Sequence, residues 1–228
     1  MESKKYCIFA CGGHGTRMGS AVPKQFLRLG GKTILQLSIE RILEAVPGTK
    51  VITVLPEEYI QFWIKESHQS GLDEPQSLVA GGISRFHSVR NALDRVPDDS
   101  IVAVHDGVRP FVSADLVRRL FDEALTHPAV VPVVPVTDTI KVLDSDLKEI
   151  AGAVADGSVL FGAQTPQLFR GETIKAAYRQ PFDVSFTDDA SVVRKNGVEV
   201  RYVPGEKYNL KITTPEDLLL AGSLLSSL

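Results

Sequence analysis

Residues 5–18 read KYCIFACGGHGTRM, an apolar run that leads into a glycine-rich segment. The run from Lys5 to Cys11 carries no polar face, which predicts a strand that is buried on both sides. Such strands are typical of parallel sheets that helices cover on each face. The glycine-rich turn directly after this first strand allows backbone N–H groups to approach a phosphate closely.

Further short β-rich runs alternate with segments of helical spacing. The expected strands are 51–55, 101–105 and 129–135, and the expected helices are 33–45, 57–67, 84–94 and 113–126. The C-terminal part adds a helix at about 188–196, strands at 198–203 and 209–212, and a last helix with Thr214 as N-cap and Pro215 at its first position. This alternation predicts an α/β fold, a Rossmann-like doubly wound and mostly parallel sheet, in which ligands bind at the carboxyl ends of strands.

The segment from Val136 to Phe161 does not follow this rhythm. It alternates apolar and polar residues around Asp144-Ser145-Asp146, which predicts a β-hairpin arm that projects from the core. No linker or repeat interrupts the chain, so we expect residues 1–228 to form a single domain with an arm at about 136–161.

Composition limits the classes of function. The chain has 228 residues, 43% hydrophobic and 23% charged, with a net charge of -3, which excludes a disordered chain and argues against a nucleic-acid-binding protein. The longest apolar segment, 130–136, is too short to span a membrane and contains two prolines. The apolar run before the first glycines is too short for a secretory signal, so we expect a cytoplasmic protein.

A disulfide bond and a structural zinc site are also disfavoured. Cys7 and Cys11 share one expected strand, where roughly 13 Å separates them, beyond the reach of a disulfide. The five histidines show neither paired helical spacing nor cysteine partners, so a structural zinc site is not expected.

The glycine-rich segment fits two familiar phosphate motifs poorly. A dinucleotide fingerprint would need a third glycine where Met18 stands, and a P-loop ending at Gly31-Lys32-Thr33 would need one at Phe26. What remains is a glycine loop followed by Arg17 and Lys24, a spacing that suits a triphosphate. The ordinary alternative is a tight turn followed by two solvated cations.

A carboxylate is expected beside this loop. Asp106 follows the strand that ends near His105, so it falls at a carboxyl end, where ligands bind. Magnesium takes one or two carboxylates and completes its shell with substrate phosphates, so Asp106 is a candidate ligand. An Asx turn with Arg109 as its ion-pair partner is equally compatible with the sequence.

Two more segments are candidates for ligand contact. Gly81-Gly82 precedes a helix with Ser84 as its expected N-cap, which would suit either a ligand edge or a plain capped turn. Lys211 lies just before Thr213 and the last helix, where it could face either an anion or solvent.

Taken together, these residues resemble the 2-C-methyl-D-erythritol 4-phosphate cytidylyltransferase family of the nucleotidyltransferase superfamily, which includes the sugar-phosphate pyrophosphorylases. The resemblance covers nearly the whole chain. The motifs that carry it are Gly13-His14-Gly15-Thr16-Arg17-Met18, Pro23-Lys24-Gln25, Gly81-Gly82 with Arg85 and Ser88, His105-Asp106 with Arg109-Pro110, Asp138-Thr139 with Lys141, Thr165-Pro166-Gln167, Thr187-Asp188-Asp189-Ala190, and Lys211-Ile212-Thr213 with Pro215-Glu216-Asp217.

The resemblance implies an enzyme that transfers the cytidylyl group of CTP to 2-C-methyl-D-erythritol 4-phosphate and releases pyrophosphate, in non-mevalonate isoprenoid biosynthesis. It implies Mg²⁺ or another divalent cation as cofactor, and a homodimer that exchanges its arms. The residues implied to be catalytic are Arg17 and Lys24, and those implied to bind CTP are Gly12, Gly13, Gly15, Gly82, Ser88 and Asp106, with Asp106 also the metal ligand. The residues implied to bind the polyol phosphate are Arg109, Thr139, Thr187 and Lys211, with Thr139 supplied by the neighbouring subunit.

Two departures from the family pattern concern the substrates. Ile83 stands where members often carry an acidic residue, and 155–158 hold no arginine where one usually grips the polyol phosphate. A ribitol 5-phosphate cytidylyltransferase therefore remains an alternative. A non-catalytic nucleotide-binding protein is a further one, although the cations Arg17 and Lys24 and the carboxylate Asp106 are all present.

Overall fold

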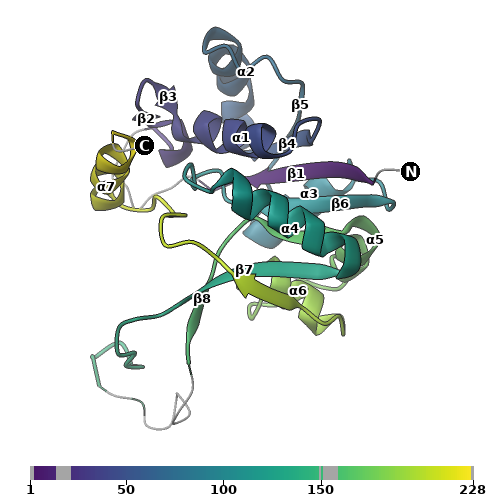
Figure 1. The fold of residues 1–228 in the computed structure, drawn as a ribbon, viewed down its shortest axis with the longest axis vertical. Coiled ribbons are helices and arrows are strands. Elements are labelled where there is room, and N and C mark those ends of the chain that lie inside the picture. Colours follow the sequence, from purple (N-terminus) through teal and green to yellow (C-terminus); the bar gives the residue numbers. More distant parts are fainter. Residues whose placement is uncertain (1–2, 14–21, 149, 151–158, 227–228) are drawn as a thin grey trace.

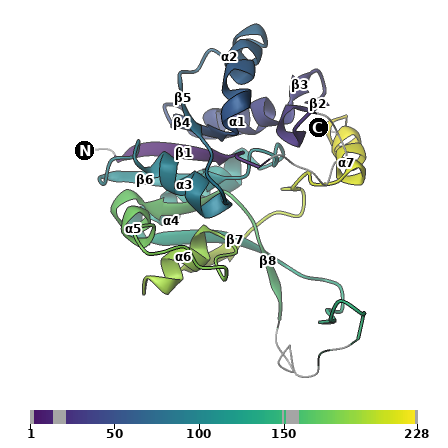
Figure 2. The same cartoon turned by 180° about the vertical axis from the view of Figure 1, so that it is seen from behind.

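The computed structural model describes residues 3–13, 22–148, 150 and 159–226. A central sheet runs through the molecule with helices on both faces, as Figure 1 shows from one side and Figure 2 from behind. Its strands lie in the order β10 (Arg201–Pro204), β7 (Ala129–Pro135), β9 (Gln167–Arg170), β6 (Ser100–His105), β1 (Lys4–Ala10), β4 (Lys50–Leu55) and β5 (Gln76–Ala80). Strand β8 (Phe161–Ala163) pairs with β7 off this path.

The sheet is mostly parallel, as the sequence predicts. Strand β1 is parallel to β4 and β6, β4 is parallel to β5, and β10 is parallel to β7. Strand β9 is antiparallel to both of its neighbours and separates β6 from β7. The mixed α/β architecture is therefore confirmed, with one reversed strand inside the sheet.

Helices cover both faces because the strands are apolar on both. Cys7 and Phe9 of β1 belong to one core cluster and Ile8 belongs to the other, and none of the three side chains is exposed. The first cluster includes residues of α1 (Ile34–Ala45), α2 (Ile60–Gln69) and α4 (Ala114–Thr126). The second includes residues of α3 (Arg85–Leu93), α5 (Gly171–Ala177) and α6 (Asp189–Lys195).

A third apolar cluster fixes the C-terminal helix. Ala221 of α7 (Pro215–Leu225) packs with Ile34 of α1 and Leu29 of β2 (Arg28–Leu29), which pairs with β3 (Lys32–Thr33). The helix begins where predicted, because the Thr214 side chain accepts the Asp217 backbone N–H and the Asp217 side chain accepts the Thr214 backbone N–H. This packing carries the end of the chain back beside the first third of the fold.

Several boundaries differ from the sequence prediction. The strand expected at 209–212 is wrong: the Ile212 N–H donates to the Val108 carbonyl at 2.9 Å, so this segment pairs with a loop and not with a strand. The strand expected at 198–203 begins later, at Arg201. A 3-10 turn, η3 (Glu57–Tyr59), replaces the start of the helix expected at 57–67. Strands β5 and β9 and helix α5 were not expected.

The arm leaves the sheet after β7 and returns through β8, and it projects from the body of the molecule in Figure 1. The Val136 N–H donates to the Leu160 carbonyl at 2.8 Å and the Ile150 N–H to the Val142 carbonyl at 2.8 Å. Asp144 Oδ1 accepts the N–H groups of Asp146 and Lys148, which closes the turn. The projecting segment predicted at 136–161 is thus observed in its described part, with regular pairing near its base.

Two further observations concern the cysteines and membrane-spanning helices. Cys7 and Cys11 are both buried, free thiols. None of the helices in the described ranges is long and apolar enough to cross a membrane.

Candidate active site

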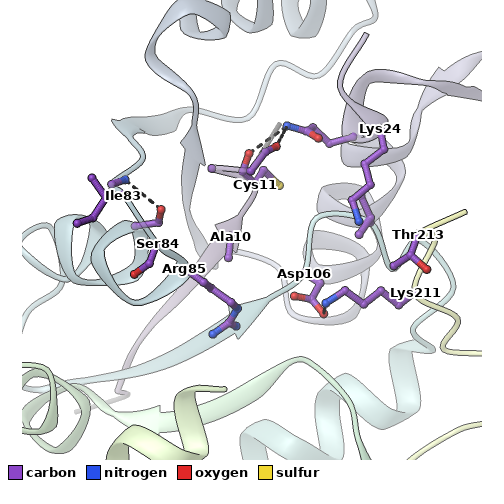
Figure 3. A pocket seen from close by; sticks show the side chains of 15 residues that line it. Ala10, Cys11, Lys24, Ile83, Ser84, Arg85, Asp106, Lys211 and Thr213 are labelled. Carbon is purple, nitrogen blue, oxygen red and sulfur yellow. Dashed lines mark hydrogen bonds and ion pairs between the residues drawn. The ribbon is translucent and has the colours of Figure 1, made fainter. Parts of the chain in front are cut away.

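A cleft of about 520 Å³ opens where β1 and β6 end. Its walls come from the start of the glycine loop, the turn that carries Lys24, the loop and helix start after β5, the end of β6, and the segment before α7. Figure 3 shows the side chains of Lys24, Asp106 and Lys211 directed toward the same end of this cleft. The cleft therefore lies at the carboxyl ends of strands, where the sequence predicts that a ligand binds.

Most of the described candidate residues line this one cleft. They are Gly12, Gly13, Lys24, Gly82, Ser88, Asp106 and Lys211. Gly15 and Arg17 lie outside the described residues. Arg109, Thr139 and Thr187 are described but are not among the residues that line the cleft.

Two glycine segments meet at one wall of the cleft. A Cβ atom on Gly12 would lie 2.7 Å from Ser88 Oγ and 3.4 Å from the Gly81 Cα atom, so no larger residue fits without a shift. The Gly82 N–H donates to Ser88 Oγ at 3.0 Å, which joins the loop after β5 to α3. The two loops therefore pack directly against each other at this wall of the cleft.

The turn that carries Lys24 is anchored by the two residues that follow this lysine. Lys24 begins the 3-10 helix η2 (Lys24–Phe26), and Gln25 and Phe26 are buried. The Phe26 ring stacks near Trp63, with 5.9 Å between the ring centroids. The Gln25 Nε2 atom donates to the Cys11 carbonyl at 3.0 Å and to the Gly13 carbonyl at 3.4 Å. Lys24 is thus held beside the glycine loop by its two buried neighbours.

Asp106 is an ionised carboxylate inside a ring of cations. Its Oδ2 atom lies 3.1 Å from Arg109 Nε and 3.1 Å from Lys211 Nζ. Burial alone would raise the pKa of Asp106, but Lys211, Arg85 and Arg109 together hold that pKa well below its usual range. The carboxylate is therefore charged at neutral pH.

His105 is linked to Asp106 through the hydroxyl group of Thr165. The Asp106 N–H donates to Thr165 Oγ1 at 3.0 Å, and Thr165 Oγ1 lies 3.0 Å from His105 Nδ1. His105 Nε2 lies 3.3 Å from the Arg109 carbonyl, which only accepts, so the proton is on Nε2 and the Thr165 hydroxyl donates to Nδ1. Burial lowers the pKa of His105 to about 4, so it stays neutral and takes no part in general acid catalysis at neutral pH.

Arg85 is a cleft residue to which the sequence analysis gave no role. Its guanidinium makes two bonds to the fully buried Asp189, at 2.9 and 2.6 Å, and Asp189 also accepts the Tyr178 hydroxyl at 2.5 Å. Burial works against the charge of Arg85, but Asp189 raises its pKa above the ordinary value. The motifs containing Arg85 and Asp189 were the signal that could have identified this pair.

Cys11 lines the cleft without being a nucleophile. Burial, with a smaller contribution from Asp106, raises the pKa of the Cys11 thiol to about 12. The thiol is therefore protonated at neutral pH. Cys11 therefore acts as a small buried hydrophobic residue at the base of the cleft.

The three remaining candidates lie elsewhere. Arg109 is buried behind Asp106, and its Nη1 atom donates to the Asn209 carbonyl at 2.7 Å. Thr187 lines a separate cleft of about 710 Å³ between α6 and the base of the arm. Thr139 is exposed on the arm itself. Within one chain, the structure does not bring these three residues into the cleft that holds Lys24.

Comparison with known proteins identifies the family. The family model of 2-C-methyl-D-erythritol 4-phosphate cytidylyltransferase matches residues 6–227. The chain belongs to this family.

Individual relatives agree with that membership. The chain is 42% identical over 218 residues to the 2-C-methyl-D-erythritol 4-phosphate cytidylyltransferase of Bacteroides fragilis, covering 96% of this chain and 98% of that one. It is 42% identical over 228 residues to the enzyme of that name from Porphyromonas gingivalis, covering all of both chains. The crystal structure of the cytidylyltransferase from Thermus thermophilus has a TM-score of 0.72 at 31% identity, covering 99% of this chain and all of that one.

A divalent cation in the cleft of this cytidylyltransferase family member would need oxygen ligands in addition to those of the described residues. Asp106 is the single carboxylate among the described residues that line the cleft. The described part of the chain holds no cluster of three or more His, Cys, Asp or Glu side chains that could bind a metal. One carboxylate plus phosphate oxygens and water is the arrangement that Mg²⁺ favours at nucleotide sites, so the residues present fit a phosphate-bound Mg²⁺.

Proposed function

We propose that this chain transfers the cytidylyl group of CTP to 2-C-methyl-D-erythritol 4-phosphate and releases pyrophosphate. The observation that carries the proposal is the convergence of Lys24, Asp106 and Lys211 with two glycine segments in one cleft of a cytidylyltransferase family member. Cations and backbone N–H groups suit a triphosphate, and the closely packed glycines suit a flat base and sugar.

The nucleotide half of the cleft is assigned by its chemistry. Gly12 and Gly13, continued by Gly15, would present backbone N–H groups to the CTP phosphates. Gly82 and Ser88 would contact the cytosine and ribose. Asp106 would hold the cation, which when bound neutralises phosphate charge and orients the triphosphate.

The transfer step needs no general base. A phosphate monoester with a second pKa near 6 is mostly dianionic at neutral pH, so its oxygen can attack the α-phosphorus of CTP directly. The P–O bond to pyrophosphate breaks as the new one forms, in line. Lys24, together with Arg17, would stabilise the charge that builds on the α-phosphate, so positioning and electrostatics supply the catalysis.

The polyol phosphate half is assigned to the Lys211 end of the cleft. Lys211 would bind the phosphate, and Arg109 would add positive charge from behind Asp106. Thr187 and Thr139 would complete the site, the latter from a second copy of the chain, because Thr139 is exposed on the projecting arm of its own subunit. The proposal therefore includes a homodimer that forms through the arm.

Subunit exchange tests that part of the proposal. Thr139→Ala and Lys24→Ala should each be weakly active alone. If Thr139 acts across the dimer, dissociating and mixing the two variants forms hybrids with one intact site, so part of the activity returns. Sedimentation of the wild-type protein should give a dimer mass. A monomer, or no recovery in the hybrids, would remove Thr139 from the site.

The activity itself is tested with purified protein, CTP and Mg²⁺, offering each polyol phosphate in turn while pyrophosphate is measured. We expect release with 2-C-methyl-D-erythritol 4-phosphate. Release only with ribitol 5-phosphate would overturn the choice of acceptor, and CTP binding without any release would indicate a non-catalytic protein. The cytoplasm is the proposed location, in line with the two buried free thiols Cys7 and Cys11.

A further inference from the structure

Gln25 is a buried amide that joins two parts of the cleft. It is 2% exposed, and its Nε2 atom donates to the carbonyls of Cys11 and Gly13, at 3.0 and 3.4 Å. These carbonyls lie on either side of Gly12, and Lys24 directly precedes Gln25 in η2. One side chain therefore connects the glycine loop to the turn that presents the lysine.

The direction of these bonds matters for anion binding. In a planar trans peptide, the carbonyl of one residue and the N–H of the next point in opposite directions. Because Gln25 holds the Cys11 carbonyl, the Gly12 N–H is directed away from Gln25. A carbonyl oxygen turned toward a phosphate would repel it, so fixing these two oxygens determines which face of the loop is electropositive.

The loop is fixed on its other sides as well. The Cys11 N–H donates to the Val54 carbonyl of β4 at 3.0 Å, and Gly12 packs against Gly81 and Ser88. Gln25 supplies the side-chain bonds on the remaining side, and it is held by the aromatic packing of the adjacent Phe26 against Trp63. Gln25 supplies a neutral donor there, whereas an ionised carboxylate would repel both carbonyl oxygens.

From this geometry we propose that Gln25 is a positioning residue of the transfer reaction: it orients Gly12 and Gly13 for the CTP phosphates and sets the place of Lys24. The inference rests on the proposed function, because the anion that the loop receives is taken to be CTP. Gln25 does not contact the polyol phosphate in this assignment. Its loss should therefore affect the nucleotide and spare the acceptor.

Three variants separate this role from a merely structural one. Gln25→Met keeps the length of the side chain and removes both donors, Gln25→Glu keeps the shape and replaces the donor by an acceptor, and Gln61→Glu is the same exchange at an exposed position of α2. For the first two we expect kcat/KM for CTP to fall on the order of 10- to 100-fold, with the KM of the polyol phosphate nearly unchanged. Gln61→Glu should behave as wild type.

The pH dependence of Gln25→Glu gives a second readout. Burial beside two carbonyl oxygens favours the protonated form of the introduced carboxyl group, and that form donates one hydrogen bond. CTP affinity relative to wild type, measured by calorimetry without acceptor, should therefore rise as the pH is lowered from about 8 to about 6. Gln25→Met should show no such recovery.

Each outcome decides the proposal. Unchanged CTP affinity in Gln25→Met, a parallel loss for both substrates, or a Gln25→Glu affinity that tracks wild type at every pH would each overturn the positioning role. Because calorimetry measures CTP binding directly, the two affinity results do not depend on turnover. A wild-type protein that binds CTP but releases no pyrophosphate would instead contradict the proposed function.

Discussion

Lys211 Nζ lies 3.1 Å from Asp106 Oδ2, so an ion pair joins the segment before α7 to the carboxyl end of β6. Together with Arg85 and Arg109, this lysine keeps the pKa of Asp106 below its ordinary value of 3.8. A carboxyl group whose pKa is lower in the folded than in the unfolded chain stabilises the fold above the unfolded pKa. That contribution is lost as the pH falls through the folded pKa.

We therefore predict how Asp106→Asn changes the free energy of unfolding. The variant leaves Lys211 and Arg109 without their shared anion, so it should be less stable than wild type by an amount that stays constant from about pH 8 to pH 5. Below about pH 4 the difference should shrink. Urea denaturation at each pH measures it, and a difference that grows toward acid would contradict an ionised Asp106.

Lys24→Ala should lower kcat by a factor on the order of 100 or more, because the proposed role of this cation is to stabilise charge in the transition state. The matched control is Lys32→Ala, which removes a half-exposed lysine paired with Glu40 at 2.8 Å, away from the cleft. The control should keep near wild-type turnover. Steady-state pyrophosphate release compares the two, and equal rates for both variants would remove Lys24 from the transition state.

Gly82→Ala should weaken CTP binding and the fold together. The added Cβ atom would lie 2.4 Å from the Cβ atom of His87, so the loop or the start of α3 must move, at a cost of about 1–3 kcal/mol. Gly222→Ala is the control, since its added atom meets nothing within 4 Å on α7, and a helical alanine should be neutral or stabilise by about 0.4–1 kcal/mol. Thermal unfolding and CTP titration would reveal whether Gly82 tolerates the methyl group.

His105 should make the fold less stable in mild acid. Burial lowers its pKa from 6.5 to about 4, so between these values the unfolded chain binds a proton that the native chain does not. The free energy of unfolding should fall as the pH decreases through this window, by at most about 1.4 kcal/mol per pH unit from this group. His105→Gln should flatten the dependence and the exposed His68→Gln should retain it, as measured by urea denaturation from pH 7 to pH 4.5.

The strands of β1, β4, β6 and β7 were predictable because residues such as Ile8 and Val102 leave no polar face along their runs. Three helix starts were equally predictable, since Ser84, Ser113 and Thr214 each accept a backbone N–H as N-caps should. Strand β9 was not, because four residues from Gln167 to Arg170 are too few to show a period.

The residues of the candidate site also divide into those that the local sequence indicates and those that it does not. Lys24 was a candidate because it follows a glycine loop, Asp106 because it follows a strand, and Lys211 because it precedes the start of a helix. The strand wrongly expected at 209–212 has an apolar alternation that nothing local contradicts. Its backbone groups bind instead to Arg109 and Val108, more than 90 residues earlier in the chain: the Asn209 carbonyl accepts from the Arg109 side chain, and the Ile212 N–H donates to the Val108 carbonyl. Local periodicity does not predict such a pairing. Periodicity is equally silent on the partnership of Arg85 with Asp189, 104 residues apart, to which only the motifs that contain them point.

The docking of Ile212 onto Val108 has a consequence for how the cleft is acquired during synthesis. A chain that emerges from its N-terminus has the glycine loop, Lys24 and Asp106 long before it has Lys211. Until the segment with Lys211 and Thr213 has been made, the Asp106 carboxylate lacks one of its cations and one wall of the cleft is missing. A polypeptide that has not yet reached Lys211 therefore lacks one of the charges beside Asp106, even though it already contains Lys24 and the glycine segments.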